Sequence, residues 1–561
     1  MYLKIKKLLP LLTFLFSSLA SFTVLDLYYF STQSPDFGTY FSYIEFFTNN
    51  GNSTGHGHGL LYYYLVSVTT VLKSDLLTSV TFNSVVSSAV ILTNYLIYLL
   101  GLAGYFQILK KINYSSGAIF LTFAGISFLP PVLEMIMYLK PEILAFALLP
   151  WIIFSFDNFI YTKKYFHLIA SLLLLSVLLQ TKGSVFGIVL IFLFMYYFDF
   201  IKNEFPLLLK ITPLFLIVFL IVFLENYSVN QIHLFNHIPQ DFSSYQNRAS
   251  ISLIYHINKF DFWYFPIFNY HSNSFIGISL LDTFGDYFNL SFNNDKSYLF
   301  YDEVQFSNNS FIQKFFRQYL GIVMTLLFYL SSFIYFLLKR KKRIVVVSPL
   351  IGMVILLINA FGFPDLNFDP TKGDTLKVHY YSFILCFSLI LLLIDALKRQ
   401  GIFSYFLIMT LIISSLFISG FPKVDGSNIN FYLESKASFT NMCSFNKKVL
   451  TRSLDTNCDQ VENFCMHNIN SEDISEKLLL DKQVRHISIE DNIKVINNLG
   501  VGIQINDKND CLIKLSDSSN SLITQYSTLA NIPIINLLYL ITGMLLIITS
   551  IFKKNQIFYK F

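Results

Sequence analysis

Long apolar runs separated by short polar connections dominate this sequence of 561 residues. A helix needs about 20 apolar residues to cross a bilayer core of about 30 Å, and runs close to this length recur along the whole chain. They lie at 8–29, 85–107, 116–136, 143–159, 166–181, 184–200, 208–224, 318–338, 344–363, 381–397, 402–420 and 532–552. Only 13% of the residues are charged, about half the share in a soluble domain. The sequence therefore predicts an all-α polytopic membrane protein with about twelve transmembrane helices.

Basic residues gather in every second connection between these runs. Cytoplasmic loops of membrane proteins are enriched in Lys and Arg, so we expect these connections and both termini to face the cytoplasm. The basic clusters are Lys4, Lys6 and Lys7; Lys110 and Lys111; Lys163 and Lys164; Lys202 and Lys210; Lys339 to Arg343; Lys398 and Arg399; and Lys553 and Lys554. The first run could instead be a cleaved signal peptide, because it follows a basic segment and Ala20 offers a cleavage site. The run continues well past Ala20, which favours a retained helix.

The connection at 421–531, which we expect on the extracytoplasmic side, differs in composition from the rest of the chain. Asn, Asp, Ser and Lys replace Phe and Leu there, and the alternating segments VRHISI and VGIQI predict strands. We therefore divide the chain into a transmembrane module at 1–420, a small extracytoplasmic α+β domain at 421–531, and a last helix with a cytoplasmic tail at 532–561. The middle unit holds four cysteines, which suggest two disulfides with three alternative pairings, or else four unpaired thiols. They are Cys443, Cys458, Cys465 and Cys511.

The first outside loop, residues 30–84, contains two predicted helices that are too short to cross the membrane. Phe37, Tyr40, Phe41, Ile44 and Phe47 recur at helical spacing, so residues 37–48 can form an amphipathic helix on the membrane surface. A turn rich in Gly and Asn follows. The apolar run at 60–72 is shorter than a membrane span and predicts a second interfacial helix.

Three motifs face the same side of the predicted membrane and follow one another along residues 1–420. The first is Asp36 with the stretch His58-Gly59-Leu60-Leu61-Tyr62-Tyr63-Tyr64, the second is Lys140-Pro141-Glu142, and the third is Lys377-Val378-His379-Tyr380-Tyr381. Together they resemble the GT-C superfamily, in particular the branch that contains protein O-mannosyltransferases and the aminoarabinose transferases of lipid A. That branch shows an Asp followed by a His-Pro-Pro-Leu-Tyr-Tyr-type stretch. Here Gly59 and Leu60 stand in place of the two prolines.

The resemblance implies an integral membrane glycosyltransferase that moves a sugar, with inversion, from a polyprenyl-phosphate donor to an acceptor hydroxyl. It also implies a site on the extracytoplasmic face of a bacterial inner membrane. The partners are then the bilayer, the lipid-linked sugar and a lipid, glycan or protein acceptor, with no nucleic acid. The sequence has no P-loop, Gly-rich dinucleotide turn, Ser-centred elbow or CxxC pair, so use of a nucleotide sugar is not supported.

Two carboxylates are the predicted catalytic residues, because sugar transfer needs a base for the acceptor hydroxyl. The resemblance makes Asp36 that base, and a setting rich in Phe and Tyr would desolvate it; the alternative is that Asp36 caps the helix at 37–48. Glu142 would orient the acceptor or bind a divalent cation together with Asp36, or would only interact with the dipole at a helix start. No metal ligand set is predicted, because His56 and His58, two residues apart, are a weak metal signal.

The remaining candidates would bind substrate, with positive groups facing the departing phosphate. Lys182 lies in the turn between the fifth and sixth runs and would contact that phosphate, or would be a plain turn lysine. Lys140 would assist or would extend toward the membrane surface. The other predicted binding residues are Tyr40, His56, His58 and Tyr62 in the first loop, Asp286 in the segment 281–287, and Lys372, Lys377, His379 and Tyr380 before a late run. For Asp286 the alternative is ordinary loop packing, and for the last group it is a solvated loop.

Two other functions stay open at this stage. A transporter or lipid flippase would carry ionisable groups deep in its spans and show internal repeats, whereas here Glu225 and Asp395 lie near the ends of runs and no repeat is visible. A GT-C-like polysaccharide ligase or polymerase with a diphosphate-linked donor would have a similar sequence. A catalytically inactive sensor of lipid-linked sugar is a third alternative.

Overall fold

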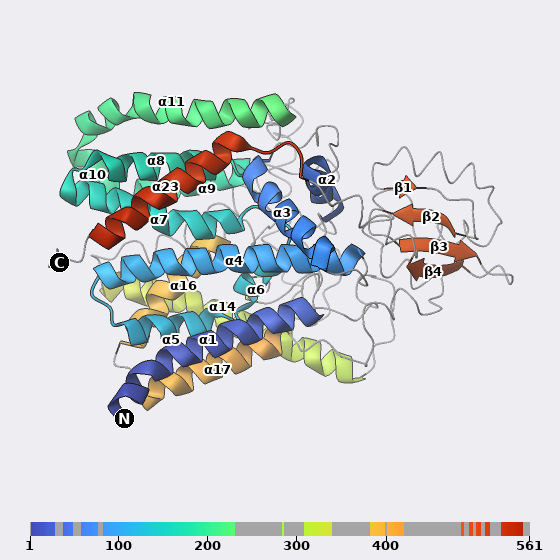
Figure 1. Cartoon of the computed structure of the whole chain (residues 1–561). Coiled ribbons are helices and arrows are strands. Elements are labelled where there is room, and N and C mark those ends of the chain that lie inside the picture. Colours follow the sequence, from blue (N-terminus) through green and yellow to red (C-terminus); the bar gives the residue numbers. More distant parts are fainter. Residues whose placement is uncertain are drawn as a thin grey trace, which may run out of the picture.

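The structure is a computed structural model that describes residues 2–28, 37–48, 58–76, 82–230, 283–284, 308–338, 382–398, 401–419, 484–486, 493–497, 501–505, 511–515 and 529–553. Most of these residues are helical (Figure 1). The helices are α1 (Tyr2–Tyr28), α2 (Phe37–Thr48), α3 (Leu60–Leu76), α4 (Phe82–Lys111), α5 (Ser116–Ile126), α6 (Pro130–Met137), α7 (Ile143–Thr162), α8 (Tyr165–Leu179), α9 (Gly183–Tyr196), α10 (Phe198–Asn203), α11 (Phe205–Asn230), α14 (Asn308–Leu338), α16 (Ser382–Ala396), α17 (Ile402–Ser419) and α23 (Ile534–Lys553).

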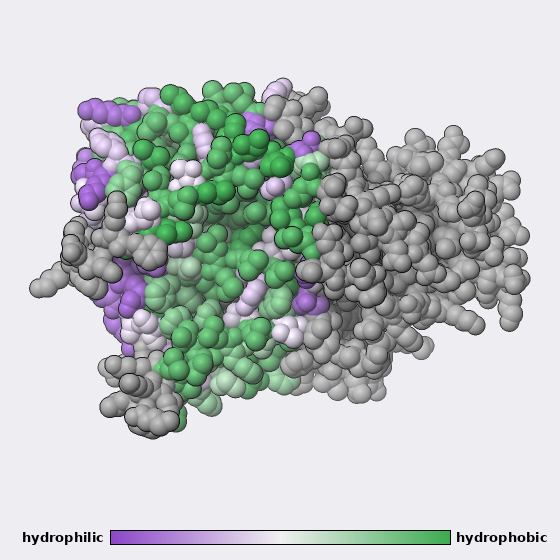
Figure 2. Space-filling view, in the orientation of Figure 1, coloured by the Kyte–Doolittle hydropathy of each residue, from purple (hydrophilic) through white to green (hydrophobic). Residues whose placement is uncertain are grey.

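The long helices form one bundle. α4 packs against α7, α7 against α8, and α8 against α23, while α1, α16 and α17 pack against α5. The helix ends that carry Lys110, Lys163 and Lys202 lie on the same side as the start of α1 and the end of α23, on the left of Figure 1. We call this side the basic end, and Figure 2 shows hydrophilic side chains gathered there.

Among the described residues, five helices are long and apolar enough to cross a membrane, or six spans if the bent pair α5–α6 counts as one. Their outer faces expose large apolar side chains, among them Phe16, Leu216 and Leu545, and much of the described surface in Figure 2 is hydrophobic. A contiguous apolar surface of this extent suits contact with lipid, so the chain is a membrane protein. Every predicted run except 344–363 overlaps a helix; that run lies outside the described residues, and the total of about twelve spans stays a prediction.

The run at 116–136 is not one straight helix, which corrects the expectation from the sequence. α5 ends at Ile126, α6 begins at Pro130, and the two axes meet at 73°. Pro130 and Pro131 follow one another at this break. A proline has no N–H for the helical ladder, and its ring clashes with the preceding turn. The break directs the short, fully buried α6 toward the turn that carries Lys140 and Glu142.

α2 has the bounds that the sequence predicts, and α3 runs slightly further than the predicted 60–72. Their surroundings differ from the expected membrane surface, because Tyr43, Ile44 and Phe47 are 0% exposed. The chain that leads into α23 covers α2: the N–H of Ala530 donates to the carbonyl of Phe47 at 2.6 Å, and the side chain of Asn531 donates to the carbonyl of Phe46 at 2.9 Å. The described side chains of α2 are therefore covered by protein rather than by lipid.

α23 is held in the bundle through its first turn. Glu225, near the end of α11, accepts hydrogen bonds from the N–H groups of Ile535 and Asn536, both at 2.7 Å. The side-chain amide of Asn536 donates to the same carboxylate at 2.7 Å. The first N–H groups of a helix have no partner within the helix, and a negative charge there is favoured by the helix dipole. This carboxylate therefore joins α23 to the helices of residues 1–420.

Within 421–531 the structure describes one antiparallel sheet in the order β1-β2-β3-β4. Its strands are β1 (Val484–His486), β2 (Ile493–Asn497), β3 (Val501–Ile505) and β4 (Cys511–Leu515), and the two alternating segments of the sequence coincide with β1 and β3. The disulfides stay a prediction, because Cys443, Cys458 and Cys465 lie outside the described residues. Cys386 in α16 is a buried free thiol.

Candidate functional site

A buried ion pair lies at the end of the bundle opposite the basic end. Lys182 Nζ and Glu142 Oε1 are 2.7 Å apart, and the two side chains are 7% and 3% exposed. The same Nζ donates a hydrogen bond to the Tyr40 hydroxyl at 3.1 Å. Three segments that are distant in sequence thereby meet: the first outside loop, the turn before α7 and the turn between α8 and α9.

Neither member of the pair has the simple local role that its sequence position allows. Glu142 precedes α7, but its side chain makes no capping hydrogen bond to that helix and binds Lys182 instead. Lys182 precedes α9 in extended conformation and is buried, so it is not a solvated turn lysine. Glu142 Oε2 is buried and has no hydrogen-bond partner among the described residues. The carboxylate therefore keeps one acceptor oxygen that the described part of the protein does not use.

Asn94 in α4 fixes the turn that carries Glu142. Its side-chain amide donates to the carbonyls of Ile136, in the last turn of α6, at 2.9 Å and of Tyr138, the residue after that helix, at 2.7 Å. Carbonyls at the end of a helix lack partners within it. Its Oδ1 accepts a hydrogen bond from the Tyr62 hydroxyl at 2.9 Å. Burial raises the pKa of the Tyr62 hydroxyl, so this group stays protonated and keeps donating. The contacts link α3, α4 and α6 beside the ion pair.

The turn that carries Lys182 touches the start of α3. The N–H of Gly59 donates to the carbonyl of Thr181 at 3.0 Å, and a Cβ at position 59 would lie 2.4 Å from the Gln180 carbonyl oxygen. Proline would lack this N–H and would add carbon where there is no room. The close approach of two backbones therefore favours glycine at position 59.

We expect Gly59→Ala to lower the thermal unfolding midpoint of the purified protein, because the added Cβ meets backbone atoms that cannot rotate away. Overpacking of this kind costs about 1–3 kcal/mol. Gly187→Ala in α9 is the matched control, since an added Cβ there meets nothing within 4 Å and Ala favours a helix by about 1 kcal/mol over Gly. Equal midpoints for the two variants would contradict the close approach at Gly59.

Aromatic rings surround the ion pair on the side of the first loop. The His58 ring lies edge-on to the Tyr40 ring with centroids 5.3 Å apart, and the rings of Tyr43 and Tyr63 stack at 4.1 Å. The backbone N–H of His58 donates to the Tyr43 hydroxyl at 2.9 Å. This packing holds the His58 ring next to the tyrosine that contacts Lys182.

The structure brings part of the predicted site together. Lys140 is buried near Glu142, with Nζ 5.4 Å from the centre of the Tyr138 ring, where a cation is attracted by the ring face. The predicted residues that gather here are Tyr40, His58, Tyr62, Lys140, Glu142 and Lys182. The predicted residues that lie outside the described residues are Asp36, His56, Asp286, Lys372, Lys377, His379 and Tyr380.

The described residues contain no group of three or more His, Cys, Asp or Glu side chains that could hold a metal ion. A divalent cation between Asp36 and Glu142 stays an alternative, because Asp36 is not among those residues.

A polar network beside the site was not predicted. Asn226 in α11 donates to the Gln180 side chain at 2.8 Å and accepts from Asn536 of α23 at 3.0 Å, and Gln180 donates to the carbonyl of Phe219 at 2.8 Å. The network fixes the turn that precedes Lys182 against the last helix. The sequence does contain a signal for this network. Gln180, Asn226 and Asn536 are amide side chains within or next to apolar runs, where polar groups usually pair with one another.

A second unpredicted group joins α1, α3 and α4. Ser88 donates to Asp26 Oδ1 at 2.5 Å and accepts a hydrogen bond from Lys73. Burial lowers the pKa of Lys73, and the nearby Asp26 opposes that shift. The serine bridges opposite charges on two helices, which makes a structural clamp the simplest role for this group.

Comparison of the chain with known protein families, characterised proteins and solved structures found no match in any of the three. A function for this site therefore has to be inferred from its own geometry together with the motifs in the sequence.

Proposed function

We propose that this protein is an integral membrane glycosyltransferase that moves a sugar from a polyprenyl-phosphate donor to an acceptor hydroxyl. The observation that carries the proposal is the buried cluster of Tyr40, Glu142 and Lys182. Glu142 belongs to the second motif that resembles GT-C enzymes, and Tyr40 lies in the first outside loop, four residues after Asp36 of the first motif. Their meeting is what a shared active site requires.

The positive charges of the cluster suit a departing phosphate. Lys182 is held in place by Glu142 and Tyr40, and Lys140 is buried two residues before Glu142. A cation that is already positioned in a site with little water stabilises developing negative charge without reorganisation. The two lysines are therefore the proposed contacts to the donor phosphate.

Asp36 is the proposed base, with Glu142 as the second carboxylate. Asp36 precedes Tyr40 by four residues, so their Cα atoms lie within about 14 Å of one another by chain length alone. Glu142 Oε2, buried without a hydrogen-bond partner among the described residues, would orient the acceptor hydroxyl or share a divalent cation with Asp36. The reaction would invert the configuration of the transferred sugar.

The proposed location follows from the basic end of the bundle. Lysines at membrane-helix ends favour the cytoplasmic side, and the cluster lies at the opposite end. The active site would then face the extracytoplasmic surface of a bacterial inner membrane, where the headgroup of the donor is presented.

A flippase or transporter is the second candidate, and the buried Glu142–Lys182 pair is the observation that favours it. Ionisable residues inside membrane proteins often mark a transport path. The two candidates differ in products, because a transferase splits the donor into sugar and polyprenyl phosphate whereas a flippase leaves the donor intact.

The test is reconstitution of the purified protein in liposomes with synthetic polyprenyl-phosphate sugars and panels of lipid, glycan and peptide acceptors. Release of polyprenyl phosphate together with a glycosylated acceptor of inverted configuration is the expected result. Movement of intact donor across the bilayer without its cleavage would instead establish the flippase. Activity with diphosphate-linked donors alone would place the protein with ligases or polymerases.

A further inference from the structure

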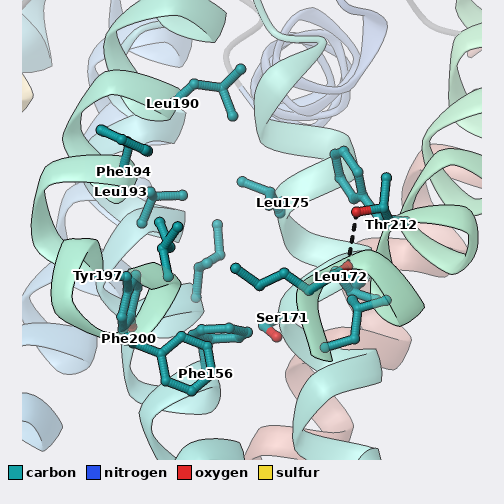
Figure 3. A pocket seen from close by; sticks show the side chains of 15 residues that line it. Phe156, Ser171, Leu172, Leu175, Leu190, Leu193, Phe194, Tyr197, Phe200 and Thr212 are labelled. Carbon is teal, nitrogen blue, oxygen red and sulfur yellow. Dashed lines mark hydrogen bonds between the residues drawn. The ribbon is translucent and has the colours of Figure 1, made fainter. Parts of the chain in front are cut away.

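A cavity lies near the basic end of the bundle, away from the site described above. It has a volume of about 390 Å³ and is lined by residues of α7, α8, α9, α10 and α11, a size within the usual range for ligand pockets. Figure 3 shows Leu190, Leu193 and Phe194 of α9 on one side and Leu172 and Thr212 on the other. Leu190 and Phe194 are partly exposed, which opens the cavity toward the surrounding bilayer.

The cavity is a wedge between two helices that touch at one end. At the ends away from the basic side, Phe186 of α9 and Phe219 of α11 have ring centroids 6.3 Å apart. Toward the basic end, the space between α9 and α11 is the cavity, and Phe200 and Ile201 of α10 contribute to its wall. The Phe186–Phe219 contact therefore closes the cavity at the end away from the basic side, and α10 bounds it near the basic end.

The polar groups in the cavity wall already have partners. The Ser171 hydroxyl donates to the carbonyl of Leu168 at 2.8 Å, Thr212 donates to Leu208 at 2.9 Å, and the Tyr197 hydroxyl donates to Asp157 at 3.0 Å. The remaining lining is hydrocarbon. An occupant therefore meets a wall that is almost entirely hydrocarbon, as suits the acyl chain of a lipid.

Exposed lysines lie in the chain segments next to this lining. Lys202 follows two lining residues of α10, and Lys163 and Lys164 form the turn that leads into α8. Lys210 is exposed on the other face of α11, because the lining residues of that helix are three or four positions apart and Lys210 is two positions after Leu208. Asp157 next to the lining is paired with Lys111, and Glu204 and Asp199 are outnumbered by the four other lysines, so this end has a net positive charge. A headgroup at this position would have to be anionic for electrostatic complementarity.

We propose that the cavity binds an anionic glycerophospholipid of the adjacent leaflet, with one acyl chain in the cavity and its headgroup at Lys202. Moving an acyl chain from the bilayer into an apolar cavity changes its free energy little, because both surroundings are hydrocarbon. The preference of the cavity for one lipid over another therefore depends on the headgroup. A basic residue near the membrane surface contributes about 1 kcal/mol to binding of anionic lipid, which is about a fivefold preference. The proposal does not depend on the transferase reaction.

The test uses phosphatidylglycerol and phosphatidylcholine that carry the same photoactivatable group on the acyl chain. The full-length protein is reconstituted with each lipid, irradiated, and the labelled residues are mapped by mass spectrometry. We expect phosphatidylglycerol to label the cavity lining at least about fivefold more than phosphatidylcholine. Equal labelling by both lipids would overturn the proposal, as would preferential labelling of the cavity by a photoactivatable polyprenyl phosphate.

Two kinds of variant separate the headgroup from the chain. Lys202→Gln should lower labelling by phosphatidylglycerol about fivefold, whereas Lys210→Gln, on the other face of α11, and Lys110→Gln, at the same end of the bundle on α4, should not change it. Leu190→Trp places a larger side chain at the partly exposed edge and should lower labelling by both lipids. An equal effect of all three lysine substitutions, or unchanged labelling of Leu190→Trp, would overturn the assignment.

Discussion

Asp36→Asn should lower the rate of sugar transfer about 10²- to 10⁴-fold, the usual cost of losing a general base. Asparagine keeps the size and polarity of the side chain but cannot take the proton of the acceptor hydroxyl. The rate is measured in liposomes with a polyprenyl-phosphate sugar, with amounts of folded protein matched to the wild type.

The same substitution distinguishes the base from a helix cap. Asparagine caps a helix as well as aspartate does, so a residue that only begins α2 would tolerate the change. The thermal unfolding midpoint should therefore be unchanged while the rate falls. Near-normal transfer by Asp36→Asn would mean that the base lies elsewhere, and Glu142 would then be the next candidate.

Lys182→Met and Glu142→Leu should each destabilise the protein by about 3–5 kcal/mol, because each leaves one buried charge without its partner. Both variants should also lose transfer by a factor of about 10² or more, as when a preorganised charge is removed from an active site. Stability is followed by thermal unfolding at one fixed heating rate, since unfolding of such proteins is often irreversible.

The double variant Lys182→Met with Glu142→Leu separates structure from catalysis. Apolar side chains of similar volume can replace a buried ion pair with little loss of stability, or even a gain. We therefore expect the unfolding midpoint to return close to that of the wild type while transfer stays absent. A stable double variant with normal transfer would show that the pair is only structural.

The helices of the bundle follow from features that lie close together in the sequence. Each apolar run is a local signal, and the break between α5 and α6 has a local cause as well, since Pro130 and Pro131 stand next to each other at the bend. If the two prolines had been interpreted as a helix break, the run at 116–136 would have been predicted as two helices instead of one. The bounds of α2 likewise follow from the spacing of its aromatic residues.

Which segments pack against those helices depends on contacts between distant parts of the chain, and the local spacing of apolar residues does not predict such contacts. Tyr43 and Phe47 look like the apolar face of an interfacial helix, yet α2 is covered by Ala530 and Asn531 from near the other end of the chain. Glu142 and Lys182 were each recognised as candidates. Their pairing was not predicted, because it brings together turns 40 residues apart.

The hydrogen bonds between Glu225 and α23 also bear on how the chain is made. Glu225 and Asn536 are separated by 311 positions, so at about 5–20 residues per second the carboxylate is synthesised roughly 15–60 s before its partner helix. Through that interval Glu225, Asn226 and the turn before Lys182 lack the helix that completes their hydrogen bonds. Insertion of α23 is then the step that locks the assembled bundle. A chain that terminates before residue 534 should retain its earlier helices in the membrane but become a substrate for quality-control proteases.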